Sequence, residues 1–210
     1  MNVTDLALLD ATTANLIALE LFSLPVAKWI LKSDNTQTHA LAIPRQAGTP
    51  TTYTSLDGVT WVTTSVTGAW GSSDIPVDVA WSPYLGLWMV AVQVGGVAST
   101  VKFYKSSDGV SWTIMGSGLT TQAVSAITAC GTVWITATYN SSSFYSHIIV
   151  SADGASWYGT QTYLRPTSSS PPVLASSPTQ VGLIAQPTST GVLNPYRFTP
   201  EFGIPDAVLT

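Results

Sequence analysis

The chain has 210 residues, of which 45% are hydrophobic and only 9% are charged, and its formal net charge is −4. This hydrophobic content excludes a disordered chain, because disordered segments combine low hydrophobicity with high net charge. The 7 Lys and Arg residues are too few for a basic nucleic-acid-binding patch, and no apolar run reaches the roughly 18 residues of a membrane span. We therefore expect neither a nucleic-acid partner nor insertion into a membrane.

The N-terminal segment, residues 1–23, differs in pattern from the rest of the chain. Residues 5–21 are compatible with an amphipathic helix, whereas residues 15–22 are compatible with a strand that closes a ring, and periodicity does not separate the two. The segment also lacks the positive n-region of a signal peptide, which predicts synthesis in the cytoplasm without general export. We therefore assign residues 1–23 as an anchor or a ring-closing strand.

The remaining residues, 24–210, contain a motif that occurs three times at nearly regular spacing. The motif is S-x-D-G-x-[ST]-W, and a degenerate fourth copy lies near residues 199–203. Such spacing predicts internal repeats, near 24–74, 75–121, 122–168 and 169–210. The residues that define the motif are Ser55, Asp57, Gly58 and Trp61 in the first copy, Ser106, Asp108, Gly109 and Trp112 in the second, and Ser151, Asp153, Gly154 and Trp157 in the third.

Each motif predicts the tip of a β-hairpin. Asp-Gly between two β-type runs is a strong hairpin signal, because Gly accepts a positive φ and Asp accepts hydrogen bonds from nearby backbone amides. The motif Trp then returns on the next strand and packs a large apolar face beside the turn. The motif residues are therefore predicted to be structural.

The flanks of each motif predict three further strands. In the second repeat these lie near 78–81, 87–92 and 100–104, and in the third near 123–127, 132–137 and 145–150. Four antiparallel strands in a module of this length are typical of a propeller blade. The predicted fold is therefore all-β and β-propeller-like, with about four four-stranded blades.

The motif resembles the Asp-box (BNR) repeats of sialidases and related β-propellers, whose usual form is S-x-D-x-G-x-[ST]-W. The present sequence lacks the residue between Asp and Gly. Shortened tips of this kind also resemble repeats in propeller-like regions of phage tail and other virion proteins. The resemblance implies a propeller in which the Asp-box is a structural device, and a fold by itself does not imply a function.

A sialidase-type site is not matched by this sequence. The resemblance to sialidases implies three arginines that clamp a carboxylate, a Tyr–Glu nucleophile pair and an acid–base Asp. Arg45, Arg165 and Arg197 are three arginines, but Arg45 follows its Ile-Pro pair instead of preceding it. Glu20 and Glu201 are the only glutamates and lie in no matching context, and four blades fall short of the six of a sialidase.

No other pattern predicts catalysis. A G-x-S-x-G nucleophile elbow is absent, and the two histidines lie at no metal-ligand spacing. Cys130 lies in an apolar run, which predicts a small buried side chain. The acidic residues Asp74 and Asp78 are interpreted as a solvated surface pair. We therefore expect no catalytic residues, no metal and no cofactor.

A binding surface is predicted on the rim opposite the Asp-Gly tips. Alternating strand directions place Trp70, Asn140 and Arg165 in or beside loops of that rim, where a rigid scaffold presents variable loops. An exposed Trp70 would stack on a sugar ring while the polar residues bind its hydroxyls. The alternative is that Trp70 caps the gap between two blades or contacts a neighbouring subunit.

These observations together predict a non-enzymatic structural or adhesive virion protein, a phage tail, fibre or capsid-associated component located on the virion. Its expected partners are other virion proteins or copies of itself, with a cell-surface glycan as a further candidate. The alternative function is a carbohydrate- or receptor-binding, lectin-like module. A sialidase-type glycosidase is the least favoured of the three.

Overall fold

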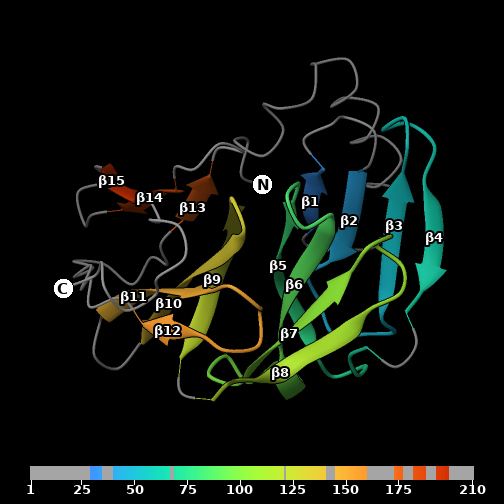
Figure 1. Cartoon of the computed structure of the whole chain (residues 1–210). Coiled ribbons are helices and arrows are strands. Elements are labelled where there is room, and N and C mark those ends of the chain that lie inside the picture. Colours follow the sequence, from blue (N-terminus) through green and yellow to red (C-terminus); the bar gives the residue numbers. More distant parts are fainter. Residues whose placement is uncertain are drawn as a thin grey trace.

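A computed structural model describes residues 29–34, 40–66, 69–120, 122–140, 145–159, 173–176, 182–187 and 193–198. Across these ranges the chain forms antiparallel β-sheets joined by loops, with one short 3₁₀ turn, η2 (Val94–Gly96), and no α-helix (Figure 1). Within the same ranges, no helix is long and apolar enough to span a membrane. The segment 1–23 lies outside the described residues.

The strands are grouped into four sheets, each formed by consecutive strands of the chain. The first sheet contains β1 (Trp29–Ser33), β2 (Ala40–Pro44), β3 (Thr51–Ser55) and β4 (Val62–Ser65); the second contains β5 (Ile75–Ser82), β6 (Leu87–Gln93), β7 (Val101–Ser106) and β8 (Thr113–Leu119); the third contains β9 (Ala123–Cys130), β10 (Val133–Asn140), β11 (Tyr145–Ser151) and β12 (Tyr158–Gly159); and the fourth contains β13 (Val173–Ser176), β14 (Gly182–Pro187) and β15 (Leu193–Phe198).

The all-β prediction is confirmed, and three of the sheets have four antiparallel strands. Each strand pairs with the one before it in the chain, so every connection within a sheet is a hairpin. This meander needs only short connections, which suits a sequence rich in Gly, Pro and Ser turns.

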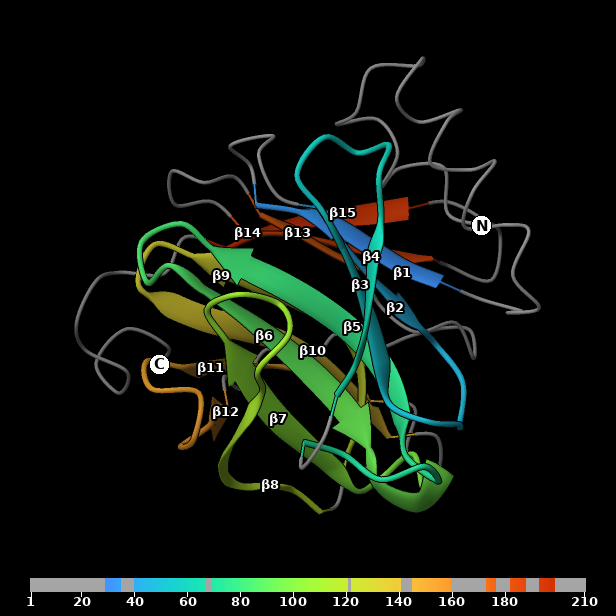
Figure 2. The same ribbon diagram turned by 90° about the vertical axis from the view of Figure 1, so that its right-hand side faces the viewer.

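The sheets are arranged so that their first strands are neighbours. β1 packs beside β5, β5 beside β9, and β9 beside β13, while the later strands of each sheet lie progressively further out (Figures 1 and 2). β5 and β9 each carry a bulge, where Val77 and Ser125 have no partner in the ladder with β6 and β10. Bulges of this kind bend a strand and increase its twist.

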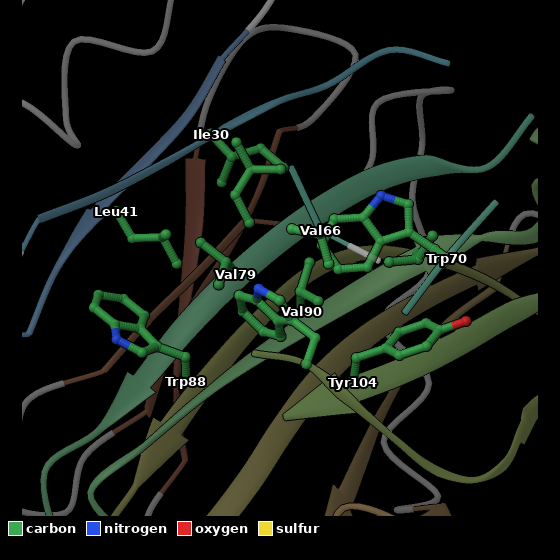
Figure 3. Close-up of a cluster of buried hydrophobic side chains, with 11 residues drawn as sticks. Ile30, Leu41, Val66, Trp70, Val79, Trp88, Val90 and Tyr104 are labelled. Carbon is green, nitrogen blue, oxygen red and sulfur yellow. The ribbon is translucent and has the colours of Figure 1, made fainter. Parts of the chain in front are cut away.

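The hydrophobic core is divided among the spaces between consecutive sheets. A first cluster joins the first and second sheets and includes Ile30, Leu41, Val79 and Trp88 (Figure 3). A second cluster joins the second and third sheets, and a third joins the third sheet to Leu174 of the fourth. The third cluster contains Cys130, which is fully buried, as predicted. Each sheet is therefore stabilised mainly by the sheet next to it.

Candidate functional site

The three motif segments connect the third and fourth strands of the first, second and third sheets, and they share one hydrogen-bond pattern. In the first, Ser55 Oγ donates to Asp57 Oδ1 at 3.0 Å, and the Gly58 N–H donates to Ser55 Oγ at 2.8 Å. The N–H groups of Val59 and Thr60 donate to Asp57 Oδ1 at 2.8 and 2.7 Å. The carboxylate thus organises its own turn.

The same bonds recur around Asp108 and Asp153. The Ser–Asp distances are 2.8 and 3.0 Å, and the Gly N–H reaches the Ser Oγ at 2.8 and 2.7 Å. Gly58, Gly109 and Gly154 have φ values of 72°, 74° and 74°, a left-handed conformation that a Cβ atom disfavours. This explains why the motif requires glycine at that position.

The backbone donors lower the pKa of each motif carboxyl group. Hydrogen bonds from Thr60 and Val59 lower the pKa of Asp57 to about 2, and those from Ser156 and Ala155 do the same for Asp153. Partial burial raises the pKa of Asp108, but the backbone hydrogen bonds of its turn outweigh burial and the value is again about 2. These carboxylates are therefore held ionised by local structure.

Trp70 does not occupy the exposed position that a sugar-stacking residue requires. Its side chain is only 7% exposed, and its ring lies 5.7 Å from the rings of both Tyr104 and Trp112 in edge-on contacts (Figure 3). The loop before β5 folds this side chain inward because a large apolar surface gains more from the inter-sheet cluster than from water. This buried position agrees with the interpretation of Trp70 as a cap on the gap between two sheets and not with an exposed, sugar-stacking Trp70.

The other two predicted binding residues are not brought together with Trp70 by the described chain. Asn140 is the last residue of β10 and pairs with Tyr145 at the start of β11. Arg165 lies outside the described residues. A binding role for Asn140 and Arg165 therefore stays a prediction.

Asp74 fixes the rim opposite the motif tips. Its Oδ2 accepts a hydrogen bond from the Gly71 N–H at 2.7 Å, and its Oδ1 accepts one from the Gly95 N–H at 2.7 Å. The buried carboxylate thus joins the connection before β5 to the loop between β6 and β7. The interpretation of Asp74 as a solvated surface residue is wrong.

Asp78 occupies the place where three first strands meet. Its Oδ2 accepts the Ile127 N–H of β9 at 2.9 Å, and its Oδ1 lies 3.8 Å from Lys32 Nζ of β1. β9 is the edge strand of its sheet, so its outward N–H groups need an acceptor from elsewhere. Asp78 supplies one from the neighbouring sheet.

The Asp78–Lys32 pair remains partly open to solvent. The side chains of Asp78 and Lys32 are 15% and 26% exposed. A carboxylate held beside an ammonium group can accept hydrogen bonds from hydroxyl groups and can exchange a proton. Sequence reasoning missed this site because its members lie far apart in the chain and no local motif joins them. Asp78 and Ile127, for example, are 49 positions apart.

In the part of the chain that the structure describes, no group of three or more His, Cys, Asp or Glu side chains could hold a metal ion. The three motif carboxylates are engaged by their own turns, and Asp74 is engaged by two backbone amides. Asp78, in contrast, lies beside a cationic side chain at the junction of several sheets. We call Asp78 and Lys32 the axial pair and take it as the candidate functional site.

Comparison with known proteins reveals similarity in fold only. No family model and no curated protein matches the sequence. A Hadza microbial sialidase superposes with a TM-score of 0.57 at 10% identity, over 77% of this chain and 40% of the sialidase. An exo-β-1,3-galactanase from Phanerochaete chrysosporium superposes with a TM-score of 0.57 at 10% identity, over 86% of this chain and 49% of the galactanase.

A GH74 xyloglucanase from Xanthomonas campestris is similar over 74% of this chain and 26% of the enzyme, with a TM-score of 0.50 and 15% identity. The chain thus spans less than half the length of each of these three proteins. At such identities the likeness defines the fold, a β-propeller type, and transfers no substrate.

The comparisons correct two predictions from the sequence. A non-enzymatic virion protein was expected, but the three matched structures are carbohydrate-active enzymes and none of the three is a virion protein. The sequence argument relied on the absence of the sialidase residues. That absence excludes the sialidase mechanism, but it does not exclude other mechanisms that the same fold supports.

Proposed function

We propose that the four sheets are four successive blades of one β-propeller, with the three motifs as Asp-box tips. Support comes from the hairpin order of every sheet, the adjacency of the first strands and the identical hydrogen bonds of the three tips. The fourth sheet, with β13 to β15 described, would be the most divergent blade, as terminal repeats often are.

We further propose that the protein is a carbohydrate-active enzyme that cleaves glycosidic bonds, with Asp78 as an acidic residue of its site. The observation that carries this proposal is the axial pair, a partly exposed carboxylate fixed between two other strands by Ile127 and Lys32. Support also comes from the fold, since the matched sialidase, galactanase and xyloglucanase act on glycans.

The chemistry of glycoside cleavage explains why a fixed carboxylate matters. Most glycosidases use carboxyl groups as acid, base or nucleophile on either side of the scissile bond, and a misplaced carboxylate loses most of its effect. The Asp78 carboxylate accepts hydrogen bonds from the Ile127 N–H of β9 and from the Val79 N–H of its own strand, and Lys32 Nζ of β1 lies 3.8 Å away. Lys32 offers an N–H donor to a sugar hydroxyl.

The test is the release of reducing sugar by the purified full chain from xyloglucan, β-1,3-galactan and sialosides. We expect turnover of at least one of these glycans and a loss of about 100-fold or more in kcat for Asp78→Asn, since general acid–base groups contribute about 10² to 10⁴. A folded wild-type protein without activity on any glycan of a broader panel would refute the proposal.

The matched control is Asp57→Asn, the same substitution in a motif tip, away from the axial pair. Asp57 accepts hydrogen bonds only within its own turn in the described chain, so we expect lower stability but unchanged kcat per folded molecule. Equal losses of kcat in Asp57→Asn and Asp78→Asn would mean that the axial pair is structural.

A further inference from the structure

The first strands of the second and third sheets have equivalent residues beside the axial pair. Val79 of β5 pairs with Val90 of β6, and Ile127 of β9 pairs with Thr136 of β10. The two pairs occupy the same place in their sheets, because Val90 and Thr136 each lie two residues after a tryptophan that pairs with a motif serine. The two sheets can therefore be compared residue by residue at this place.

The Asp78 carboxylate accepts a hydrogen bond from each of these two first strands. The Val79 N–H donates to Asp78 Oδ1 at 2.9 Å, and the Ile127 N–H donates to Asp78 Oδ2 at 2.9 Å. Val79 follows Asp78 directly in the chain, so its amide cannot fix the carboxylate relative to the third sheet. The Ile127 amide is therefore the donor that sets this position.

The Ile127 amide is supported from behind by a buried hydroxyl group. Thr136 is 0% exposed, and its Oγ1 donates to the Ala126 carbonyl oxygen at 2.7 Å. The Ala126 C=O and the Ile127 N–H belong to one peptide unit, and in a planar trans peptide these two groups point in opposite directions. A chain of hydrogen bonds therefore runs from Thr136, through one peptide unit, to Asp78.

The second sheet has no hydroxyl group at this place. Val90 occupies the position that corresponds to Thr136, and it is also 0% exposed. Valine has a methyl group where threonine has its hydroxyl group, so the packing of this position between strands does not require a hydroxyl. The hydroxyl group of Thr136 is thus a polar addition behind the one amide that reaches Asp78 from another sheet.

We propose that Thr136 is a positioning residue for Asp78 and acts through the peptide unit between Ala126 and Ile127. A hydrogen bond to a carbonyl group polarises its peptide unit and strengthens the next bond in the chain, by about 10–30% per bond. Thr136 also holds the peptide unit in place on β9, and the Ile127 amide holds the carboxylate in turn. The positioning depends only on these contacts, whereas its consequence for catalysis rests on the proposed function.

The experiment compares nuclear magnetic resonance spectra of the full chain with those of Thr136→Val at one fixed pH. We expect the Ile127 amide proton to move upfield, because its hydrogen bond to Asp78 becomes weaker, and the Asp78 carboxyl carbon to shift as well. Thr136→Ser keeps the hydroxyl group, so both signals should stay close to their wild-type positions. These signals report on the carboxylate directly and need no substrate.

The matched control is Thr138→Val, two residues further along β10 and on the same face of the strand. Thr138 is also 0% exposed, but its Oγ1 lies 2.6 Å from Gln122 Oε1 and 3.4 Å from the His147 carbonyl oxygen. The two substitutions thus remove the same buried group from one strand. We expect Thr138→Val to lower stability and to leave the Ile127 and Asp78 signals unchanged.

Turnover provides the second measurement. On a glycan that the wild-type chain cleaves, Thr136→Val should lower kcat by about two- to fivefold at unchanged KM, the effect of a hydrogen bond that is weakened and not lost. Thr136→Ser should restore kcat, and Thr138→Val should leave it unchanged. If the wild-type chain cleaves no glycan, the proposed function fails, and the spectra alone decide whether Thr136 positions Asp78.

Three results would overturn the proposal: unchanged signals of Ile127 and Asp78 in Thr136→Val, equal shifts in Thr138→Val, or shifts of the same size in Thr136→Ser. In an active enzyme, an unchanged kcat of Thr136→Val would overturn the consequence for catalysis. If Thr136→Val does not fold, the pair Thr136→Ser and Thr136→Ala gives the same comparison, because these two variants also differ by one hydroxyl group.

Discussion

The first and second motif tips have the same local structure but different surroundings. Around Asp57 and Asp108 the hydrogen bonds agree within 0.2 Å in every corresponding pair. Trp112, however, is 7% exposed between two described sheets, whereas the described residues around Trp61 all belong to its own sheet. The difference teaches that the motif encodes its turn locally, whereas its contribution to stability depends on the sheet that it meets.

The largest expected effect concerns the motif tryptophans. Trp112→Ala removes a buried ring and its hydrogen bond to Gly109, which should lower the free energy of unfolding by about 3–5 kcal/mol. Trp61→Ala, at the partly exposed counterpart, should cost less than half as much. Urea unfolding followed by circular dichroism measures both, and equal losses would break the distinction between the two tips.

An intermediate effect is expected from the motif glycine. Gly109 and Gly86 both have positive φ, at 74° and 61°, but a Cβ atom on Gly86 would meet nothing within 4 Å. Gly86→Ala should therefore cost only about 1–2 kcal/mol, the cost of a left-handed conformation. Gly109→Ala should cost about 1 kcal/mol more, because its Cβ atom would lie 3.2 Å from both Leu41 Cδ1 and Thr54 Cγ2 of the first sheet, which must move.

The matched pair separates backbone strain from contact with the preceding sheet. The measurement is the urea midpoint of each variant at an unchanged m-value. If the two substitutions were equally destabilising, the close approach of Gly109 to the first sheet would contribute nothing to stability.

The smallest effect is expected when the pH is lowered. The resulting loss of stability should be the same for all three tips. Asp57, Asp108 and Asp153 have pKa values of about 2 in the folded state, below the value of about 4 in an unfolded chain. Their contribution is thus fully present above about pH 5 and is lost as the pH falls from 4 towards 2.

Melting temperatures between pH 6 and pH 2.5 measure this loss. Each single Asp→Asn substitution at a tip should make the acid limb shallower by a similar amount, because the three carboxylates accept equivalent hydrogen bonds. If one substitution alone removed the acid sensitivity, the tips would not be equivalent.

The fold was predictable from the sequence where its signals are local. Every side-chain hydrogen bond within the tips joins residues at most three positions apart. Three copies of such a turn, with β-type runs between them, were enough to predict an all-β repeat fold. The indoles of Trp112 and Trp157 were also recognisable as large apolar groups beside their turns.

The candidate site was not predictable in the same way. Asp78 receives the Ile127 N–H from a different sheet, and Trp70 is buried by residues of the two sheets on either side of it. Both outcomes depend on how neighbouring sheets are placed, and no window of sequence contains that information. The loop context of Trp70 allowed both an exposed ring and a cap between sheets, and only the placement of the sheets shows that burial of the large ring prevails.

The second and third tips each pack on the sheet that precedes them in the chain, and this gives the molecule a direction of assembly. Gly109 and Trp112 require the first sheet as their support, and Gly154 requires the second. A ribosome delivers the sheets in this same order, so each newly emerged hairpin finds its platform already made. We therefore expect packing to follow the order of synthesis. A circularly permuted chain that begins at the third sheet would make its first tip before the second sheet, on which that tip packs.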